Sequence, residues 1–221
     1  MNFKNFGNIP FAKSRNDIIY YQEIRKLYEN IILEFPDSHI LVFTSKNQDA
    51  GKSTITEELA YMFAKDGYKV LAIDGDPHNP TLFGHILGVT EYINDIASLE
   101  EIFSNVGKVD FLCSGEKPMG VINPPSMDKI EILIQKAREL YDYVLIDTPP
   151  LNIFQDACTY AKFCEGVILV QPIFEDTSSE SNSMADSLLK DLPVIGTVMN
   201  HPKKKFILPK AKQRTIRKKK K

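Results

Sequence analysis

The feature of this 221-residue sequence that most restricts its fold is an alternation between short apolar runs and longer stretches of helical periodicity. The apolar runs have the length of strands and lie at 39–44, 69–74, 109–113, 143–147, 166–171 and 194–200. Helical stripes lie around them at 18–32, 55–63, 127–140 and 178–189. Strands that are apolar throughout and separated by helices are typical of a parallel sheet covered on both sides. We therefore predict a doubly wound α/β fold with a mainly parallel sheet and helices on both faces.

The composition is that of a folded protein, because 43% of the residues are apolar and 25% are charged. The three cysteines form no even framework and no CxxC pair, which favours a reducing compartment. No apolar run reaches the roughly 18 residues of a membrane span. Residues 1–16 also lack the apolar centre of a leader peptide. We expect a cytoplasmic protein.

Charge is distributed unevenly along the chain. Residues 1–202 carry a net charge of −13, whereas residues 203–221 carry +11 and contain no acidic residue. We predict an N-terminal extension over 1–17, one folded domain over 18–200, and a disordered polybasic tail over 201–221. Basic residues mixed with a few apolar ones favour binding to an anionic membrane surface through residues 203–221. Nucleic acid is the weaker candidate, and a tail that only solubilises the chain or folds back on its acidic body stays open.

The first apolar run leads directly into the sequence SKNQDAGKST at 45–54, and a helical stripe follows. Strand, loop and helix in this order are the context of a phosphate-binding loop. Backbone N–H groups at the helix start can bind phosphate oxygens, Lys52 can reach the outer phosphates, and the Ser53 hydroxyl can ligate Mg²⁺. Lys46 replaces the glycine expected five positions before Gly51, so a simple helix start stays open. The candidate nucleotide-binding residues are Asp49, Ala50, Gly51, Lys52, Ser53 and Thr54.

Two further apolar runs end in carboxylates. One ends in IDGD, with Asp74 and Asp76, and another ends in IDTPP, with Asp147. In open α/β sheets, ligands bind at the carboxyl edge of the strands. A carboxylate at that edge is poorly solvated unless it meets a cation or hydrogen-bond donors. A magnesium ion held by Ser53 and by nucleotide phosphates would supply that cation.

These motifs resemble those of a known family. TSxxxxxGKST, VLxIDGDxxxPT and YDYVLIDTPP, with CSG and PPS between them, look like the bacterial tyrosine kinases of capsule and exopolysaccharide operons. That family is related to the deviant Walker ATPases, which include the chromosome-partitioning and septum-site proteins. The resemblance covers roughly residues 20–200. It implies a P-loop fold, ATP and Mg²⁺ as cofactors, and phosphoryl transfer to a tyrosine hydroxyl of a protein substrate.

The resemblance also implies roles for individual residues. Lys52 matches the phosphate-binding lysine and Ser53 the Mg²⁺ ligand of the loop. Asp74 matches the aspartate that accepts the tyrosine proton, Asp76 its metal-linked partner, and Asp147 the aspartate that orders Mg²⁺ and its waters. The implied catalytic residues are therefore Lys52, Asp74, Asp76 and Asp147, and the implied metal ligands are Ser53, Asp76 and Asp147.

The family further implies partners and a location. Its soluble members are switched on by a separate transmembrane regulator of polysaccharide chain length, and they can assemble as homo-oligomers. We therefore expect such an activator, protein tyrosine substrates, a role in capsular or exopolysaccharide synthesis, and a peripheral position at the inner face of the plasma membrane.

The chain departs from the family pattern at several positions. Asp49 replaces a glycine of the loop, which predicts weaker nucleotide binding. His78 stands where an arginine is frequent, which predicts slower transfer. The last tyrosine of the sequence is Tyr160, so the tail offers none of the tyrosines that relatives autophosphorylate. The family's assembly motif E-x-x-R-x-x-R reads Gln22, Arg25 and Tyr28, which predicts weaker assembly.

Three functions are therefore compared. The leading one is an ATP-dependent tyrosine kinase, with activity that the departures reduce. The second is a positioning ATPase similar to the partitioning and septum-site proteins. Those relatives usually carry a signature lysine where this chain has Asn47, which argues against this alternative. The third is a non-catalytic nucleotide-binding scaffold.

Overall fold

The computed structural model describes residues 4–10, 18–79, 87–103, 109–115, 127–173 and 181–201. Its strands are β1 (Asn5–Ile9), β2 (Ile40–Thr44), β3 (Val70–Asp74), β4 (Val109–Leu112), β5 (Tyr143–Asp147), β6 (Gly166–Pro172) and β7 (Val194–Asn200). Its helices are α1 (Ile18–Glu34), α2 (Lys52–Lys65), α3 (Val89–Ile93), α4 (Leu99–Ile102), α5 (Met127–Leu140), α6 (Asp156–Ala161) and α7 (Ser181–Leu188). Apart from residue 201, the predicted polybasic tail lies outside the described residues.

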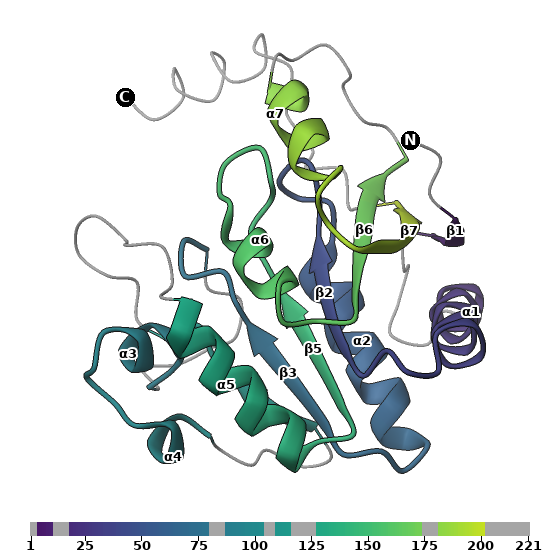
Figure 1. Cartoon of the computed structure of the whole chain (residues 1–221). Helices are drawn as coiled ribbons and strands as arrows, with labels where there is room; N and C mark the ends of the chain where they lie inside the picture. The colour runs from purple at the N-terminus through teal and green to yellow at the C-terminus, as the bar shows by residue number, and fades with distance from the viewer. Residues whose placement is uncertain are drawn as a thin grey trace, which may run out of the picture.

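The seven strands form one sheet in the order β1-β7-β6-β2-β5-β3-β4 (Figure 1). Every neighbouring pair is parallel, which confirms the predicted doubly wound α/β class. All residues of β2, β3 and β5 are buried, because these strands lie inside the sheet with helices on both faces. This double burial explains why their sequences are apolar throughout and do not alternate.

Successive residues of a strand point to opposite faces, and the two faces carry separate cores. Leu41 and Phe43 join the core under α1 and α2, whereas Ile40 and Val42 join the core under α3 to α6. A smaller third cluster connects α6 and α7 through Ala157, Ala185 and Leu169 of β6. In Figure 1, α5 and α6 lie in front of the sheet. The helices therefore cover both faces, as predicted.

The folded part begins earlier in the chain than predicted. Residues 1–17 were expected to be an extension, but β1 pairs in parallel with β7 and closes one edge of the sheet. Phe6 and Ile9 of β1 are buried against α1 and β7. The sequence signal is weak because this strand contains Asn5, Gly7 and Asn8 and has no continuous apolar run. Its pairing with a strand almost 190 residues away is what stabilises it.

The sheet places the ends of three adjacent strands together. β2, β5 and β3 are neighbours, and Asp147 pairs with Phe43 on one side and with Asp74 on the other. The loop that follows β2 leads directly into α2 at the same edge. The predicted phosphate loop and the two strand-end carboxylates therefore meet at one place. In the described parts of the chain, no helix has both the length and the apolar character to cross a membrane.

Candidate functional site

The loop before α2 has the backbone of a phosphate-binding loop. Gly51 is the N-cap residue of α2, lies in the left-handed region at φ 88°, and provides no side-chain cap. The N–H groups in the first turn of α2 therefore have no capping side chain from Gly51, and the potential at this end of the helix is positive. A Cβ at Gly51 would collide with the Asn200 side chain, whose Nδ2 donates to the Ala50 carbonyl at 2.7 Å. Asn200 at the end of β7 thus holds the loop in place.

Lys52 is directed inward, although it is the first residue of the helix. Its side chain is buried, and its Nζ donates to Ser45 Oγ at 3.1 Å. Burial lowers the pKa of Lys52, and the nearby carboxylates of Asp147, Asp76 and Asp49 oppose that effect. The ammonium group is therefore held among carboxylates at the strand ends. A negatively charged ligand at the helix start would lie within its field.

Asp147 is a fully buried carboxyl group of the site. Its Oδ2 accepts a hydrogen bond from Ser53 Oγ, and its Oδ1 is buried and has no hydrogen-bond partner among the described residues. Burial raises the pKa of Asp147 to about 7, while Lys52 and the Ser53 hydrogen bond act in the opposite direction. The carboxylates of Asp74 and Asp76 raise the pKa further. A buried carboxylate oxygen with no partner is a suitable ligand for a cation.

The turn after β3 brings its two carboxylates close to Asp147. The Asp74 carboxylate accepts from the Asp76 amide at 3.1 Å, and the Asp76 carboxylate accepts from the His78 and Asn79 amides, both at 3.1 Å. Burial raises the pKa of Asp76, and those two amide hydrogen bonds oppose the shift.

Gly75 is required between these carboxylates by close approach. Its amide donates to the Asp147 carbonyl at 2.7 Å, and an added Cβ would lie 2.9 Å from that oxygen and 3.0 Å from Tyr160 Cε2. Real Cβ atoms almost never come so close to another heavy atom, so only glycine fits without a shift of the backbone. The DGD sequence thus combines two buried acids with the one residue that lets β3 and β5 converge.

The donor set of this site fits magnesium. Ser53 and Asp147 supply hard oxygen atoms next to each other, and one Asp147 oxygen accepts no hydrogen bond from any residue that the structure describes. Among the residues that the structure describes, no three His, Cys, Asp or Glu side chains are arranged to hold a metal by themselves. Magnesium commonly uses one or two protein ligands and completes its shell with waters and substrate phosphates. The ligand role of Asp76 stays a prediction, because one of its oxygens already accepts two amide hydrogen bonds.

The histidine that replaces the family's arginine has partners that the sequence did not reveal. The His78 ring stacks on Phe154, with ring centroids 3.3 Å apart and an interplanar angle of 5°. His78 Nε2 lies 3.7 Å from Asp156 Oδ2, and burial raises the pKa of Asp156 while His78 opposes it. His78 therefore connects the turn after β3 to the start of α6.

The departures in the loop and in α1 lie in different surroundings. Asp49 is exposed and has a positive φ of 57°, while Lys46 forms an ion pair with Asp186 of α7 at 2.7 Å.

On α1, Arg25 forms an ion pair with Glu29 of the same helix at 2.8 Å. Tyr28 is buried against Phe63 and donates to Asp66 at 2.6 Å. The third position of the supposed assembly motif is thus a core residue, which its sequence spacing does not reveal.

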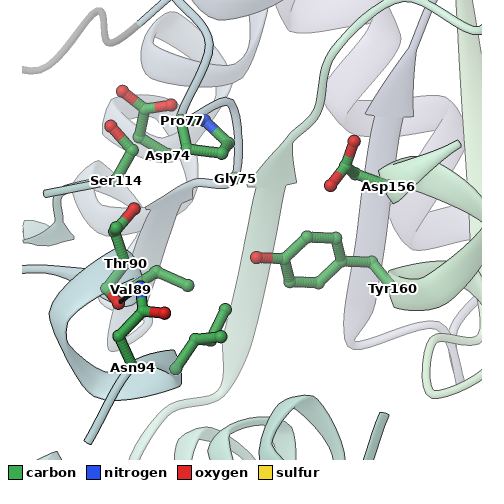
Figure 2. A pocket seen from close by; sticks show the side chains of 10 residues that line it. Asp74, Gly75, Pro77, Val89, Thr90, Asn94, Ser114, Asp156 and Tyr160 are labelled. Carbon is green, nitrogen blue, oxygen red and sulfur yellow. Dashed lines mark hydrogen bonds between the residues drawn. The ribbon is translucent and has the colours of Figure 1, made fainter. Parts of the chain in front are cut away.

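Two cavities adjoin Asp74. A small one of about 30 Å³ lies between α3 and α6, where Tyr160 and Asp156 approach it from one side and Thr90 and Asn94 from the other (Figure 2). A larger cleft of about 250 Å³ lies between α2 and the β3–β4 edge of the sheet. Ser53, Thr54, Thr56, Glu57, Ala72, Ile73, Asp74, Phe111 and Asp147 line it. Sequence reasoning identified the acids of this cleft but not Phe111 or Glu57, because neither belongs to a motif.

Comparisons with known proteins agree with this geometry. The model of the CobQ/CobB/MinD/ParA nucleotide binding domain matches residues 41–218. The tyrosine-protein kinase CpsD of Streptococcus agalactiae serotype III (strain NEM316) is 33% identical over 162 residues, which cover 68% of this chain and 67% of that protein.

Solved structures show the same fold. The crystal structure of the chimerical protein CapA2B2 matches with a TM-score of 0.77 and 26% identity, and covers 91% of this chain and 96% of that one. The septum site-determining protein MinD from Pyrococcus horikoshii OT3, complexed with Mg-ADP, has a TM-score of 0.58 and 23% identity, over 80% of this chain and 76% of that one. The predicted resemblance to tyrosine kinases within the deviant Walker ATPases is thereby confirmed.

Proposed function

The chain belongs to the CobQ/CobB/MinD/ParA nucleotide binding domain family, and from this premise we propose that it is an ATP-dependent protein tyrosine kinase. One observation carries this proposal: Asp74 and Asp147 are paired at adjacent strand ends, beside Lys52 and the first turn of α2. This arrangement combines a phosphate-binding helix end with an additional buried carboxylate. The similarity to CpsD supports tyrosine as the acceptor.

The phosphates of ATP would bind at the start of α2. The amides of its first turn and the Lys52 ammonium provide the positive groups that phosphoryl transfer needs at the transferred group. Bound Mg²⁺ would neutralise further phosphate charge, and Ser53 and Asp147 are the residues placed to hold it. The Mg-ADP bound to the MinD relative supports this choice of ligand.

Asp74 is the best candidate to orient the acceptor hydroxyl and take its proton. It is buried beside Asp147, yet it also lines the larger cleft, so an acceptor can approach it from outside. A carboxylate within hydrogen-bond reach of the nucleophile typically contributes about 10²–10⁴-fold to the rate. Water in the place of a tyrosine would turn the same site into an ATPase.

The acceptor, the activator and the location belong to the same proposal. The tail contains no tyrosine, so the acceptor lies on another protein or elsewhere in this chain. A separate transmembrane activator is supported by the resemblance to soluble capsule kinases. The net charge of +11 over residues 203–221 supports contact with an anionic membrane surface. Together these features support a kinase that acts at the inner face of the plasma membrane and controls capsular or exopolysaccharide synthesis.

The test is phosphoryl transfer from γ-labelled ATP and Mg²⁺ by the full chain, with and without the cytoplasmic peptide of the candidate activator. Phosphotyrosine and free phosphate are measured in parallel. Lys52→Met should reduce phosphotyrosine by at least about a hundredfold, whereas Lys136→Met, at an exposed lysine of α5, should have no effect. Free phosphate without phosphotyrosine would favour the positioning ATPase. Neither product, despite nucleotide binding, would favour the scaffold.

A further inference from the structure

We propose that the cleft between α2 and the β3–β4 edge is the binding site for the acceptor tyrosine, with Phe111 as its aromatic wall. The occupant is a tyrosine of a separate protein chain that has lysine or arginine beside it. This inference rests on the proposed kinase function and adds the residues that select the acceptor. Neither Phe111 nor Glu57 belongs to the phosphate loop or to the strand-end acids.

The cleft has the size and the position that an acceptor requires. Its volume of about 250 Å³ is enough for an aromatic side chain, whereas the cavity of Figure 2 has only about 30 Å³. It begins at Ser53, Asp74 and Asp147, where the phosphoryl group would be transferred, and it ends at Phe111 on the edge strand. Ligand sites are typically lined by apolar groups with a few polar groups at one end, as here.

The register of the sheet directs Phe111 and Asp74 into the same space. Ala72 and Asp74 are two residues apart on β3, so they point to the same face. Phe111 of β4 pairs with Ala72 and therefore shares that face. The two levels are separated by roughly 7 Å along the strand. A tyrosine that lies along the strand direction with its ring edge against Phe111 thus directs its hydroxyl toward Asp74.

Phe111 packs against the core under α1 and α2 and also lines the cleft. Its strand partner Ala72 is small, and the ring of Tyr61 is tilted at 60° to that of Phe111, with the centroids 6.0 Å apart. Phe111 itself is only half-buried, since β4 is the edge strand. Aromatic pairs in offset or edge-to-face contact gain about 0.5–1.5 kcal/mol beyond the burial of area. An aromatic acceptor is therefore favoured over serine or threonine.

The charge of the cleft determines the neighbours of that tyrosine. Exposed Glu57 lies on its rim, one turn after Ser53, and Asp74 and Asp147 lie at its closed end. Burial raises the pKa of Tyr61 on the next turn of α2, and the charges of Glu57 and Glu58 raise it further. A peptide with acidic residues beside its tyrosine would be repelled. Lysine or arginine at those positions complements the rim.

Binding of a fluorescein-labelled peptide, with one tyrosine between lysines, tests the inference on the full chain with Mg²⁺ and β,γ-methylene ATP. Phe111→Leu should weaken peptide binding by about three- to tenfold and leave the affinity for a fluorescent ADP analogue unchanged. Phe103→Leu, at a half-buried phenylalanine on the other face of the sheet, is the matched control. A peptide with leucine in place of tyrosine should bind wild type weakly, and it should bind Phe111→Leu with almost the same affinity. The contact between the tyrosine ring and Phe111 is absent in both cases.

The flanking charge is tested separately. Wild type should prefer the lysine peptide to a glutamate one, and Glu57→Lys should reverse that preference. Three outcomes would overturn the inference. The tyrosine peptide binds Phe111→Leu as tightly as wild type, the losses from the protein and peptide substitutions add, or wild type does not bind the peptide. The two proposals can be distinguished. If the kinase assignment is wrong, no phosphotyrosine forms while the peptide still binds at Phe111. If the cleft assignment is wrong, phosphotyrosine still forms and the KM for the peptide is unchanged in Phe111→Leu.

Discussion

The strand-end acids and the loop before α2 form two halves of one site, but the charged side chains of the first half are buried and Asp49 of the second is exposed. Asp74 and Asp147 are buried, and one oxygen of Asp147 has no partner in the described part of the chain. Asp49 is exposed in the loop, and Lys46 is paired with Asp186 of α7. Burying a carboxylate is unfavourable unless a ligand compensates, whereas an exposed charge is tolerated almost anywhere. The buried acids therefore indicate a ligand, whereas the exposed charge of Asp49 costs the fold little.

The strongest test of this contrast is Asp74→Asn. We expect phosphotyrosine formation to fall by about 10²–10⁴-fold, because the amide can neither orient nor deprotonate the acceptor. The affinity for the nucleotide should stay within a few-fold, since Asp74 does not belong to the phosphate loop. Asp128→Asn, on the exposed first turn of α5, is the control and should have no effect. Transfer that persists in Asp74→Asn would mean that the buried acids serve only the stability of the fold.

Gly75→Ala tests whether the convergence of β3 and β5 is as tight as the geometry indicates. The new Cβ would meet the Asp147 carbonyl and the Tyr160 ring, and we expect a loss of about 1–3 kcal/mol in the free energy of unfolding. Urea denaturation followed by circular dichroism measures it. Gly67→Ala is a useful comparison, because an added Cβ there meets nothing within 4 Å and only the φ of 98° is unfavourable. A smaller loss at Gly75 than at Gly67 would contradict the close approach.

Much of the fold and of the site was predictable from the sequence, and the features that were missed have physical reasons. Apolar runs identified every interior strand, and the acids at their ends identified the site, because parallel strands bring their carboxyl ends to one edge. β1 was missed because its five residues contain no continuous apolar run. Phe111 and Asn200 were missed because they reach the site through strand register alone. The sequence showed that Tyr28 departs from the assembly motif, but it did not show that the ring of Tyr28 is in the core.

The raised pKa of Asp147 predicts how stability depends on pH in the metal-free protein. The folded state holds this proton up to about pH 7, whereas an unfolded aspartate loses it near pH 4. Between those values the folded state binds more protons, so the stability contributed by this group falls as the pH rises, by about 1 kcal/mol per pH unit. Thermal unfolding in EDTA from pH 4 to 7 should therefore show a steeper loss in wild type than in Asp147→Asn. Parallel curves would exclude a raised pKa.

The smallest expected effect is a change in nucleotide affinity on replacing Asp49, in the loop before α2. Asp49→Asn removes one negative charge near the phosphates and keeps a residue that tolerates the positive φ of 57°. We expect the Kd for ATP to fall by roughly three- to fivefold at low salt, and the gain to shrink at high ionic strength because the charge is exposed. Asp37→Asn, at an exposed acid outside the loop, is the control. If the Kd does not change, the Asp49 carboxylate does not face the phosphates, and the lower affinity predicted for this chain loses its reason. If the Kd falls at every salt concentration, Asp49 acts through the loop backbone, and the two halves of the site are more alike than their burial indicates.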